Sequence, residues 1–126
     1  MGGVWMIFAD EEHKSFYIQN VQRTKSQKDP YRKALFYTLG ITGITRDCIE
    51  HIYDFNKNQI ILKALNAAWQ TGTTMRITRL AFNLYNGYLG ETEEEGYKFT
   101  PYYLFDTGLL PFMLEAIKVR YAEYAT

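Results

Sequence analysis

The sequence predicts an all-α protein, a single domain (residues 1–126) in which about five or six short helices pack around a central helix at about residues 73–86. Apolar residues recur every three or four positions in several segments, which places their side chains on one face of a helix. Residue types that begin or end helices stand at the edges of these segments. A chain of 126 residues is also typical of one domain with one core.

The first predicted helix begins after Asp10, a residue type whose side chain accepts backbone N–H groups at a helix start. It runs to about Gln22, and Phe16 and Tyr17 are its expected inward anchors. Residues 23–28 are polar and basic without periodicity, so they predict a loop.

A second helix is expected to begin with Asp29 as its cap and Pro30 at the first helical position, where a missing N–H costs nothing. It should end at Gly40. Further on, Thr45 is expected to cap a third helix, which closes at residues 51–55.

The secondary structure of one segment in the middle of the chain is ambiguous. Residues 56–58 have the composition of a turn, and residues 59–62 could form a short strand. Because the chain offers no evident partner strand, we expect an extended connector into a helix at residues 64–68 instead.

The central helix is the best-defined element. Thr73 or Thr74 can cap its start, and Gly87 can end it because glycine adopts the left-handed conformation without a steric clash. The face expected to meet the core carries Ile77, Leu80, Ala81, Leu84 and Tyr88.

The opposite face of this helix carries a polar stripe of Arg76, Arg79, Asn83 and Asn86. Arginine and asparagine make forked contacts with guanine and adenine, so such a helix could enter a major groove. The same side chains also suit a protein interface, or hydrogen bonds to neighbouring loops. With 14 basic and 14 acidic residues, the formal net charge is zero and gives no overall attraction to nucleic acid or an anionic membrane.

The charges are nevertheless segregated along the chain. Residues 14–33 hold six basic side chains and one acid. A compact acidic run follows the central helix: Glu91, Glu93, Glu94 and Glu95. Such a run is usually a solvated loop, but it can also be a docking surface for a basic partner. Tyrosines close to it, from a total of 11 in the chain, could add contact area: Tyr97, Tyr102 and Tyr103.

The C-terminal part predicts two further helices. Thr100 and Pro101 repeat the arrangement of cap and proline before a short helix, which residues 106–108 interrupt. The last helix is expected to run from about Leu110 through Tyr124 and to bury Met113, Leu114, Ile117 and Tyr121.

Catalytic and metal-binding patterns are weak. Cys48 and His51 stand three apart, a spacing that could activate a thiol, but we prefer a buried cysteine that acts as a small hydrophobe and a surface or capping histidine. His13 and His51 with Asp54 lack the spacing of a metal site. The threonines around Gly72 are explained by capping alone. We therefore expect no catalytic residues, no metal and no cofactor, and a protein that is not an enzyme.

A single cysteine makes an intrachain disulfide impossible, which favours a reducing compartment. Residues 1–8 are apolar but too short for a membrane span, and no convincing cleavage site follows them. We therefore expect a cytoplasmic location and no membrane association.

Several motifs resemble an uncharacterised family of small proteins from Gram-positive bacteria and their phages or mobile elements, which carries only a domain-of-unknown-function label. The resemblance extends over most of the chain from Phe8 onward, and the motifs that carry it lie at residues 35–37, 51–55, 69–71, 78–87 and 115–121. The most specific of them is Trp-Gln-Thr followed by Thr-Arg-Leu-Ala-Phe-Asn-Leu-Tyr-Asn-Gly. The resemblance implies a bacterial or phage origin, but it supplies no catalytic residue to transfer.

The leading functional hypothesis is a non-enzymatic protein-binding module. By analogy with small phage proteins, it would inhibit a host enzyme that handles nucleic acid, such as a CRISPR nuclease, with the acidic run occupying a basic groove. The alternative is a nucleic-acid-binding module that uses Arg76 and Arg79 together with the basic residues 14–33. The oligomeric state stays open.

Overall fold

The computed structural model describes residues 6–124, and helices form nearly all of the regular structure in this part of the chain. The expected all-α class is therefore confirmed. Residues 1–5 and 125–126 lie outside the description, so the expectation for the apolar start of the chain is described only from Met6 onward.

The elements within residues 6–124 follow one another in this order: α1 (Glu11–Arg23), α2 (Pro30–Leu39), α3 (Gly43–Asp47), α4 (Ile49–Ile52), β1 (Tyr53–Asp54), β2 (Gln59–Ile60), the 3-10 helix η1 (Leu62–Asn66), α5 (Gly72–Asn86), α6 (Glu93–Tyr97), α7 (Pro101–Leu104), α8 (Leu110–Arg120) and the 3-10 turn η2 (Ala122–Tyr124). Several of these helices have only four or five residues. Such short helices lack the periodicity that marks longer ones, which is why sequence analysis expected fewer of them.

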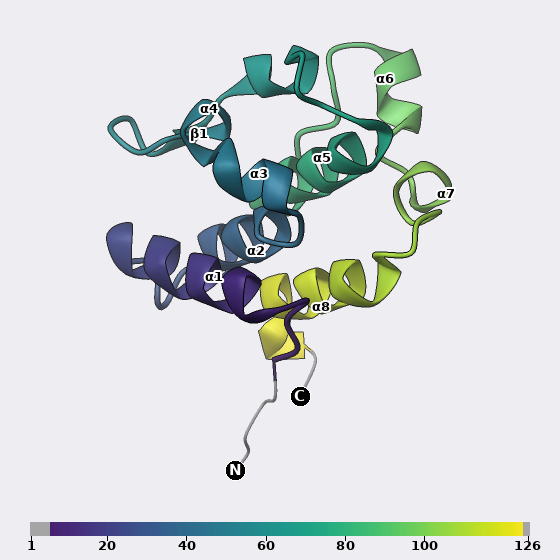
Figure 1. Cartoon of the computed structure of the whole chain (residues 1–126). Coiled ribbons are helices and arrows are strands. Elements are labelled where there is room, and N and C mark those ends of the chain that lie inside the picture. Colours follow the sequence, from purple (N-terminus) through teal and green to yellow (C-terminus); the bar gives the residue numbers. More distant parts are fainter. Residues whose placement is uncertain (1–5, 125–126) are drawn as a thin grey trace.

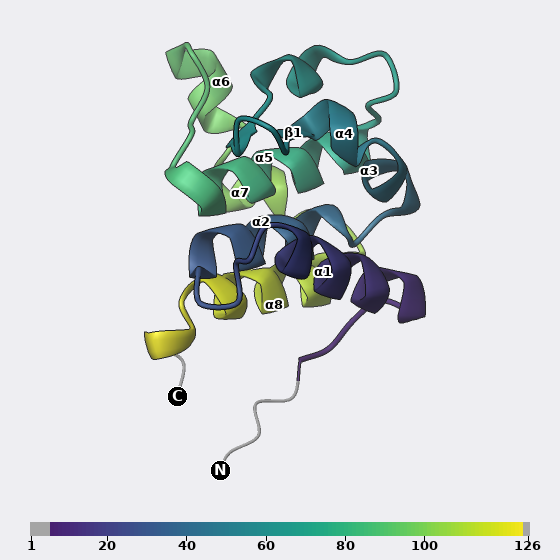
Figure 2. The same ribbon diagram turned by 90° about the vertical axis from the view of Figure 1, so that its left-hand side faces the viewer.

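Helix α2 lies at the centre of the molecule, with α1, α5 and α8 packed against it (Figure 1). In the second view it lies between α5 above and α8 below (Figure 2). All residues from Ala34 to Leu39 are fully buried. The expected central helix, now α5, contacts α2, α3, α7, α8 and η1, so other helices do pack around it. Helix α2 contains the longest fully buried run, because residues 34–39 are mostly apolar and are covered on every side.

Polar groups on α2 find partners despite their burial. The Thr38 hydroxyl donates to the carbonyl of Ala34 in the same helix at 2.6 Å. The Thr45 hydroxyl donates to the carbonyl of Leu39 at 2.5 Å. Since a buried polar group without a partner is costly, these bonds allow a fully enclosed helix to contain a threonine and to end inside the molecule.

Helix α1 is joined to α2 through a buried histidine. The Nε2 atom of His13 donates to the carbonyl of Tyr37 at 2.8 Å, while its Nδ1 atom accepts the N–H of Ala9 at 3.0 Å. A Cβ atom on Gly40 would lie 2.7 Å from the His13 ring and 2.9 Å from the Phe16 ring. A glycine at position 40 therefore permits this close approach of the two helices.

The Tyr37 side chain extends the same contact to the start of the described chain. Its hydroxyl donates to the carbonyl of Ile7 at 2.6 Å, and the N–H of Ile7 faces a carboxylate oxygen of Glu115 at 3.4 Å. Residues 6–8 are thereby held against α2 and α8.

Most of the expected helix ends are confirmed. Asp10 accepts the N–H of His13, and Asp29 accepts the N–H groups at the start of α2, where Pro30 is the first residue. Gly87 ends α5 in the left-handed conformation with φ of 79°. The expected start of α5 was wrong by two or three positions, because Thr71 is the cap. The Thr74 hydroxyl in turn accepts the N–H of Thr71, which completes a capping box.

The segment between α2 and α5 departs most from expectation. Residues 59 and 60 do form a strand, and their antiparallel partner is Tyr53–Asp54, at the end of an expected helix. The turn between the strands includes Asn58 with φ of 58°, a conformation that asparagine tolerates. The expectation of an unpaired connector was wrong. The partner strand ends at Asp54, five residues before Gln59, so the two strands form a local hairpin and no strand from elsewhere in the chain is needed. The helix expected at 64–68 is the 3-10 helix η1, which begins earlier, at Leu62.

Several expectations for α3, α4 and α8 were also wrong. Thr42, not Thr45, caps α3, and the helix expected to continue from there breaks at Cys48 into α3 and α4. Helix α8 ends at Arg120 and not at Tyr124, because residues 122–124 form the 3-10 turn η2. Leu114 on α8 and Tyr121 just after it are 47% and 41% exposed, whereas Glu115 is buried. Helix α8 is largely apolar around its circumference, so its sequence pattern does not specify which side meets the core.

Acid should destabilise the protein through His13. Burial is the main cause that lowers the pKa of His13 from its ordinary value of 6.5. The His13 ring therefore binds a proton more weakly in the folded protein than in the unfolded chain. The free energy of unfolding should have its full value above pH 6.5 and fall as the pH drops below 6.5. Urea unfolding between pH of about 8 and about 5 measures this slope.

The control for this prediction is the second histidine. Replacing His13 by Gln should flatten the slope below pH 6.5, whereas His51→Gln, at an exposed position, should keep it. An unchanged slope in His13→Gln would show that other groups cause the acid sensitivity.

Two glycines test the end of α5. A Cβ atom added at Gly87 or at Gly108 would meet nothing within 4 Å, but only Gly87 has a positive φ. Gly87→Ala should therefore lower the free energy of unfolding by about 1 kcal/mol, while Gly108→Ala should leave it unchanged or raise it. Thermal or urea unfolding compares the two variants, and equal effects would contradict the conformational explanation.

Candidate functional site

The acidic run forms a short helix, not the loop expected from its charge. Thr92 caps α6 by accepting the N–H of Glu95 at 3.1 Å. Glu95 in turn accepts the N–H of Glu91 at 2.8 Å, so its carboxylate points back toward the preceding loop. Thr92 followed three positions later by Glu95 is the sequence signature of a helix start, and it would have identified this helix.

This arrangement divides the four glutamates. Glu93 and Glu94 are exposed in the first turn of α6. Glu91 accepts a hydrogen bond from the Tyr88 hydroxyl at 3.1 Å, and Glu95 is half-buried. Two of the four carboxylates are therefore engaged locally, and the other two are presented to solvent.

Three exposed tyrosines follow these glutamates along the chain, on α6 and α7. Tyr97 ends α6 and is 59% exposed, while Tyr102 and Tyr103 on α7 are 84% and 47% exposed. The rings of Tyr102 and Tyr103 pack edge to face with centroids 5.5 Å apart. We call the five residues that α6 and α7 present here the α6–α7 surface: Glu93, Glu94, Tyr97, Tyr102 and Tyr103. Both helices lie on the side of the molecule away from α1 (Figure 1).

The polar stripe of α5 is mostly engaged within the molecule. The Nε atom of Arg76 donates to the carbonyl of Tyr103 at 2.9 Å, which ties α7 to α5. Asn83 donates to the carbonyl of Tyr88 and Asn86 accepts its N–H, so both amides close the turn after the helix. Within residues 6–124, Arg79 is the member of the stripe that forms no hydrogen bond or ion pair.

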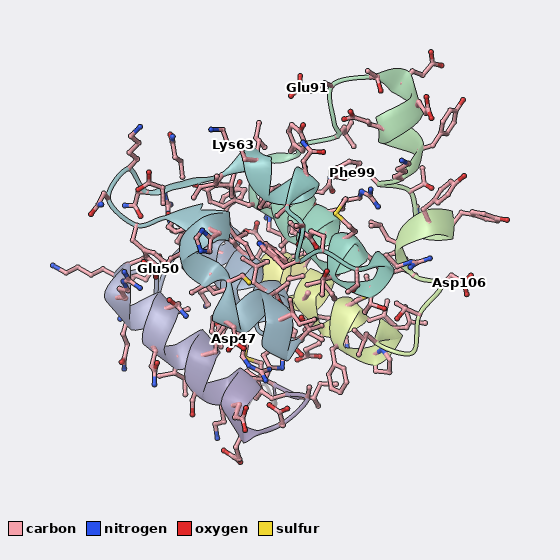
Figure 3. All side chains as sticks on the ribbon, turned by 45° about the horizontal axis from the view of Figure 1, so that its top comes forward. Asp47, Glu50, Lys63, Glu91, Phe99 and Asp106 are labelled. Atoms are coloured by element: carbon pink, nitrogen blue, oxygen red, sulfur yellow. The ribbon has the colours of Figure 1, made fainter. Side chains whose placement is uncertain are left out.

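Arg79 lines two adjoining pockets of about 340 and 260 Å³. Both pockets also include Met75 and Lys98, so together they form one groove between η1, α5 and α6, which we call the α5–α6 groove. Its charged lining consists of Lys63, Arg76, Arg79, Lys98, Glu91 and Glu95. Its apolar and aromatic lining includes Leu62, Leu65, Met75, Tyr88 and Phe99. Figure 3 labels Lys63, Glu91 and Phe99, which lie on the side of the molecule opposite α1.

Burial and a like charge act on Arg79 together. Burial is the largest cause that lowers the pKa of Arg79, and the neighbouring Arg76 lowers it further, while Glu95 opposes the change. Since an arginine stays charged at neutral pH, this cation is partly desolvated without a bonded counter-ion among the described residues. Sequence analysis selected Arg79 but missed Lys63 and Lys98, because no periodic pattern connects these distant positions.

The basic residues 14–33 do not join this groove. Helix α1, where the segment begins, and α6 lie at opposite ends of the molecule in both views (Figures 1 and 2). Arg23 pairs with Glu50 at 2.9 Å, and its guanidinium lies 3.5 Å from the centre of the Phe55 ring. Arg32 donates to Asp29 and to the Tyr53 hydroxyl. Part of this cationic segment therefore stabilises the fold.

The histidines and the cysteine do not converge. His13 is enclosed between α1 and α2, whereas His51 is exposed on α4. Cys48 is half-buried at the break between α3 and α4, and burial followed by the charge of Asp47 raises its pKa. In the described part of the chain, no group of three or more His, Cys, Asp or Glu side chains could hold a metal ion. Between residues 6 and 124, no helix combines the length and the apolar character of a membrane span.

The fold and these surfaces define a small helical protein with an acidic, aromatic surface beside a groove that contains an excess of cations. The chain belongs to a family of unknown function, DUF6075, whose model matches residues 4–126. This confirms the resemblance to a domain-of-unknown-function family. Comparisons with curated proteins and with solved structures gave no match.

Alkylation kinetics test the environment of Cys48. Because the pKa of Cys48 is raised, less thiolate is present at neutral pH, and iodoacetamide should modify it more slowly than it modifies glutathione. Mass spectrometry follows the modification, and the unfolded protein in urea is the control that should react at the ordinary rate. Faster reaction in the folded protein would restore the activated-thiol hypothesis.

Proposed function

We propose that this protein is a non-enzymatic binding protein whose α6–α7 surface engages a basic surface of another protein. The observation that carries the proposal is the presence of two exposed carboxylates, Glu93 and Glu94, on α6 and of three exposed tyrosines on α6 and on α7, the next helix along the chain. Large aromatic side chains that are this exposed gain free energy when a partner covers them.

The chemistry of the surface specifies the partner. Tyrosine offers a large contact area with few rotatable bonds, and it is enriched among the residues that dominate interface energies. Glu93 and Glu94 would guide a basic partner toward the tyrosines and disfavour an acidic one. The partner surface is accordingly cationic and contains apolar or planar groups that can cover the rings.

Enzymes that handle nucleic acid expose such basic surfaces where the phosphate backbone binds. In this proposal the α6–α7 surface occupies that site on a host enzyme, such as a CRISPR nuclease, and inhibits it by excluding nucleic acid. The protein would then act in the cytoplasm of a bacterium and come from a phage or another mobile element.

The nucleic-acid-binding alternative has less support. Arg76 is bonded to the backbone of Tyr103 and Gly72, and Asn83 and Asn86 serve the end of α5. The polar stripe therefore offers few free groups to bases, and the acidic α6 would repel phosphates close to it.

Replacement of both exposed glutamates tests the proposal. The immobilised protein is incubated with nuclease-treated bacterial lysate, and retained proteins are identified by mass spectrometry. We expect the wild type to retain a specific protein that Glu93→Gln/Glu94→Gln loses, and higher salt should weaken the complex because its charges are exposed. Titration calorimetry with the purified partner should give affinity at least about tenfold lower for the variant.

The matched control is Glu11→Gln/Glu12→Gln, because these glutamates are also exposed in the first turn of a helix. This variant should bind like the wild type. Equal binding by all three proteins would remove the α6–α7 surface from the proposal. A parallel incubation uses untreated lysate, and a protein retained there but not from the nuclease-treated lysate would favour the nucleic-acid alternative.

A further inference from the structure

The α5–α6 groove combines an excess of cations with an apolar wall. Its charged lining contains four cations, Lys63, Arg76, Arg79 and Lys98, and two carboxylates. The larger of its two pockets, about 340 Å³, lies within the range that small-molecule sites occupy. Concave sites of this kind usually join an apolar surface to a few polar groups that orient the ligand.

Among the described residues, two of the four cations are both half-buried and unbonded, whereas Lys63 is exposed and lines only the larger of the two pockets. Arg79 and Lys98 line both pockets and are half-buried. In the chain from residue 6 to residue 124, neither side chain forms a hydrogen bond or an ion pair. By contrast, the guanidinium of Arg76 is held by the carbonyls of Tyr103 and Gly72.

The carboxylates of the groove do not neutralise Arg79 by direct contact. Glu95 accepts the N–H of Glu91, and Glu91 accepts the Tyr88 hydroxyl. Both acids are thus occupied in holding the loop before α6, and neither forms an ion pair with Arg79. A half-buried cation beside a second cation is stabilised when an anion reaches it.

We propose that the α5–α6 groove binds a small organic anion whose phosphate or carboxylate group contacts Arg79 and Lys98. The body of this ligand would lie against Met75, Tyr88 and Phe99, which supply the apolar wall. Arginine makes forked contacts with both kinds of anion, and lysine adds a point charge. The groove borders the α6–α7 surface, because Tyr103 lines its smaller pocket. Arg79 and Lys98 do not belong to that surface, so the anion site does not depend on the proposed function.

The position of the acidic residues favours a compact anion over a nucleic-acid strand. Glu91 and Glu95 line the same groove, and Glu93 and Glu94 are exposed on the helix that forms its wall. An extended polyanion would bring several phosphates close to these carboxylates, whereas a small ligand places its single charged group next to Arg79.

Phenyl phosphate and benzoate are the probes, because each joins an aromatic ring to one of the two anionic groups. NMR titration of the labelled protein should show saturable shifts for at least one probe at amides of the groove, centred on Arg79 and Lys98. Phenol, which has the ring without the anion, should bind much more weakly. Comparison of the two anions then identifies which charged group the site prefers.

Substitutions locate the binding energy. Arg79→Gln and Lys98→Gln should each weaken the preferred probe by about tenfold, while Arg79→Lys should retain part of the affinity. Lys118→Gln, an exposed cation on α8, and Glu93→Gln/Glu94→Gln should bind like the wild type. The last variant separates this proposal from the proposed function, because it should lose the protein partner but keep the anion.

Several results would overturn the proposal. These are an absence of saturable binding by both anions, equal binding of phenol, or unchanged affinity in both Arg79→Gln and Lys98→Gln. Tight binding of a thymidine oligonucleotide without binding of either small anion would assign the groove to nucleic acid instead. Lys98 lies outside the regular helices, so we expect Lys98→Gln to fold normally. This variant therefore still tests the proposal if Arg79→Gln fails to fold.

Discussion

The enclosure of α2 is the constraint on which the rest of the structure depends. Its residues from Ala34 to Leu39 have no contact with solvent, so other elements must cover every side of the helix. Helices α1, α5 and α8 supply that cover. Enclosure also obliges the polar groups around α2 to pair inside the protein, and His13 and Thr45 do so through bonds to Tyr37 and Leu39.

The candidate sites lie on the side of the molecule away from α1, where the elements are mostly short helices (Figure 1). Helix α5 contacts α2 with one face, and it also contacts η1 and α7. There, hydrogen bonds position the elements: Arg76 holds α7 through Tyr103, and Thr92 with Glu95 starts α6. Short capped helices on a rigid base can present side chains in a defined arrangement without adding to the core.

Two surfaces of opposite character meet in this region. The α6–α7 surface is acidic and aromatic, while the α5–α6 groove holds more cations than carboxylates. Glu91 and Glu95 line the groove and form hydrogen bonds within the segment from Tyr88 to Glu95. A formal net charge of zero thus conceals a strong local separation of charge, which suits the recognition of two different partners by one small protein.

By itself, the sequence determined the helical class and most helix ends, because caps such as Asp10, Asp29 and Gly87 act within a few residues of the chain. It also identified the acidic and aromatic residues of α6 and α7. Tertiary structure decided that α2 is the enclosed helix, that Glu115 and not Leu114 faces inward, and that Arg79 meets Lys98 and Lys63 in one groove. Those outcomes depend on contacts between segments distant in sequence, and local periodicity carries no information about such contacts.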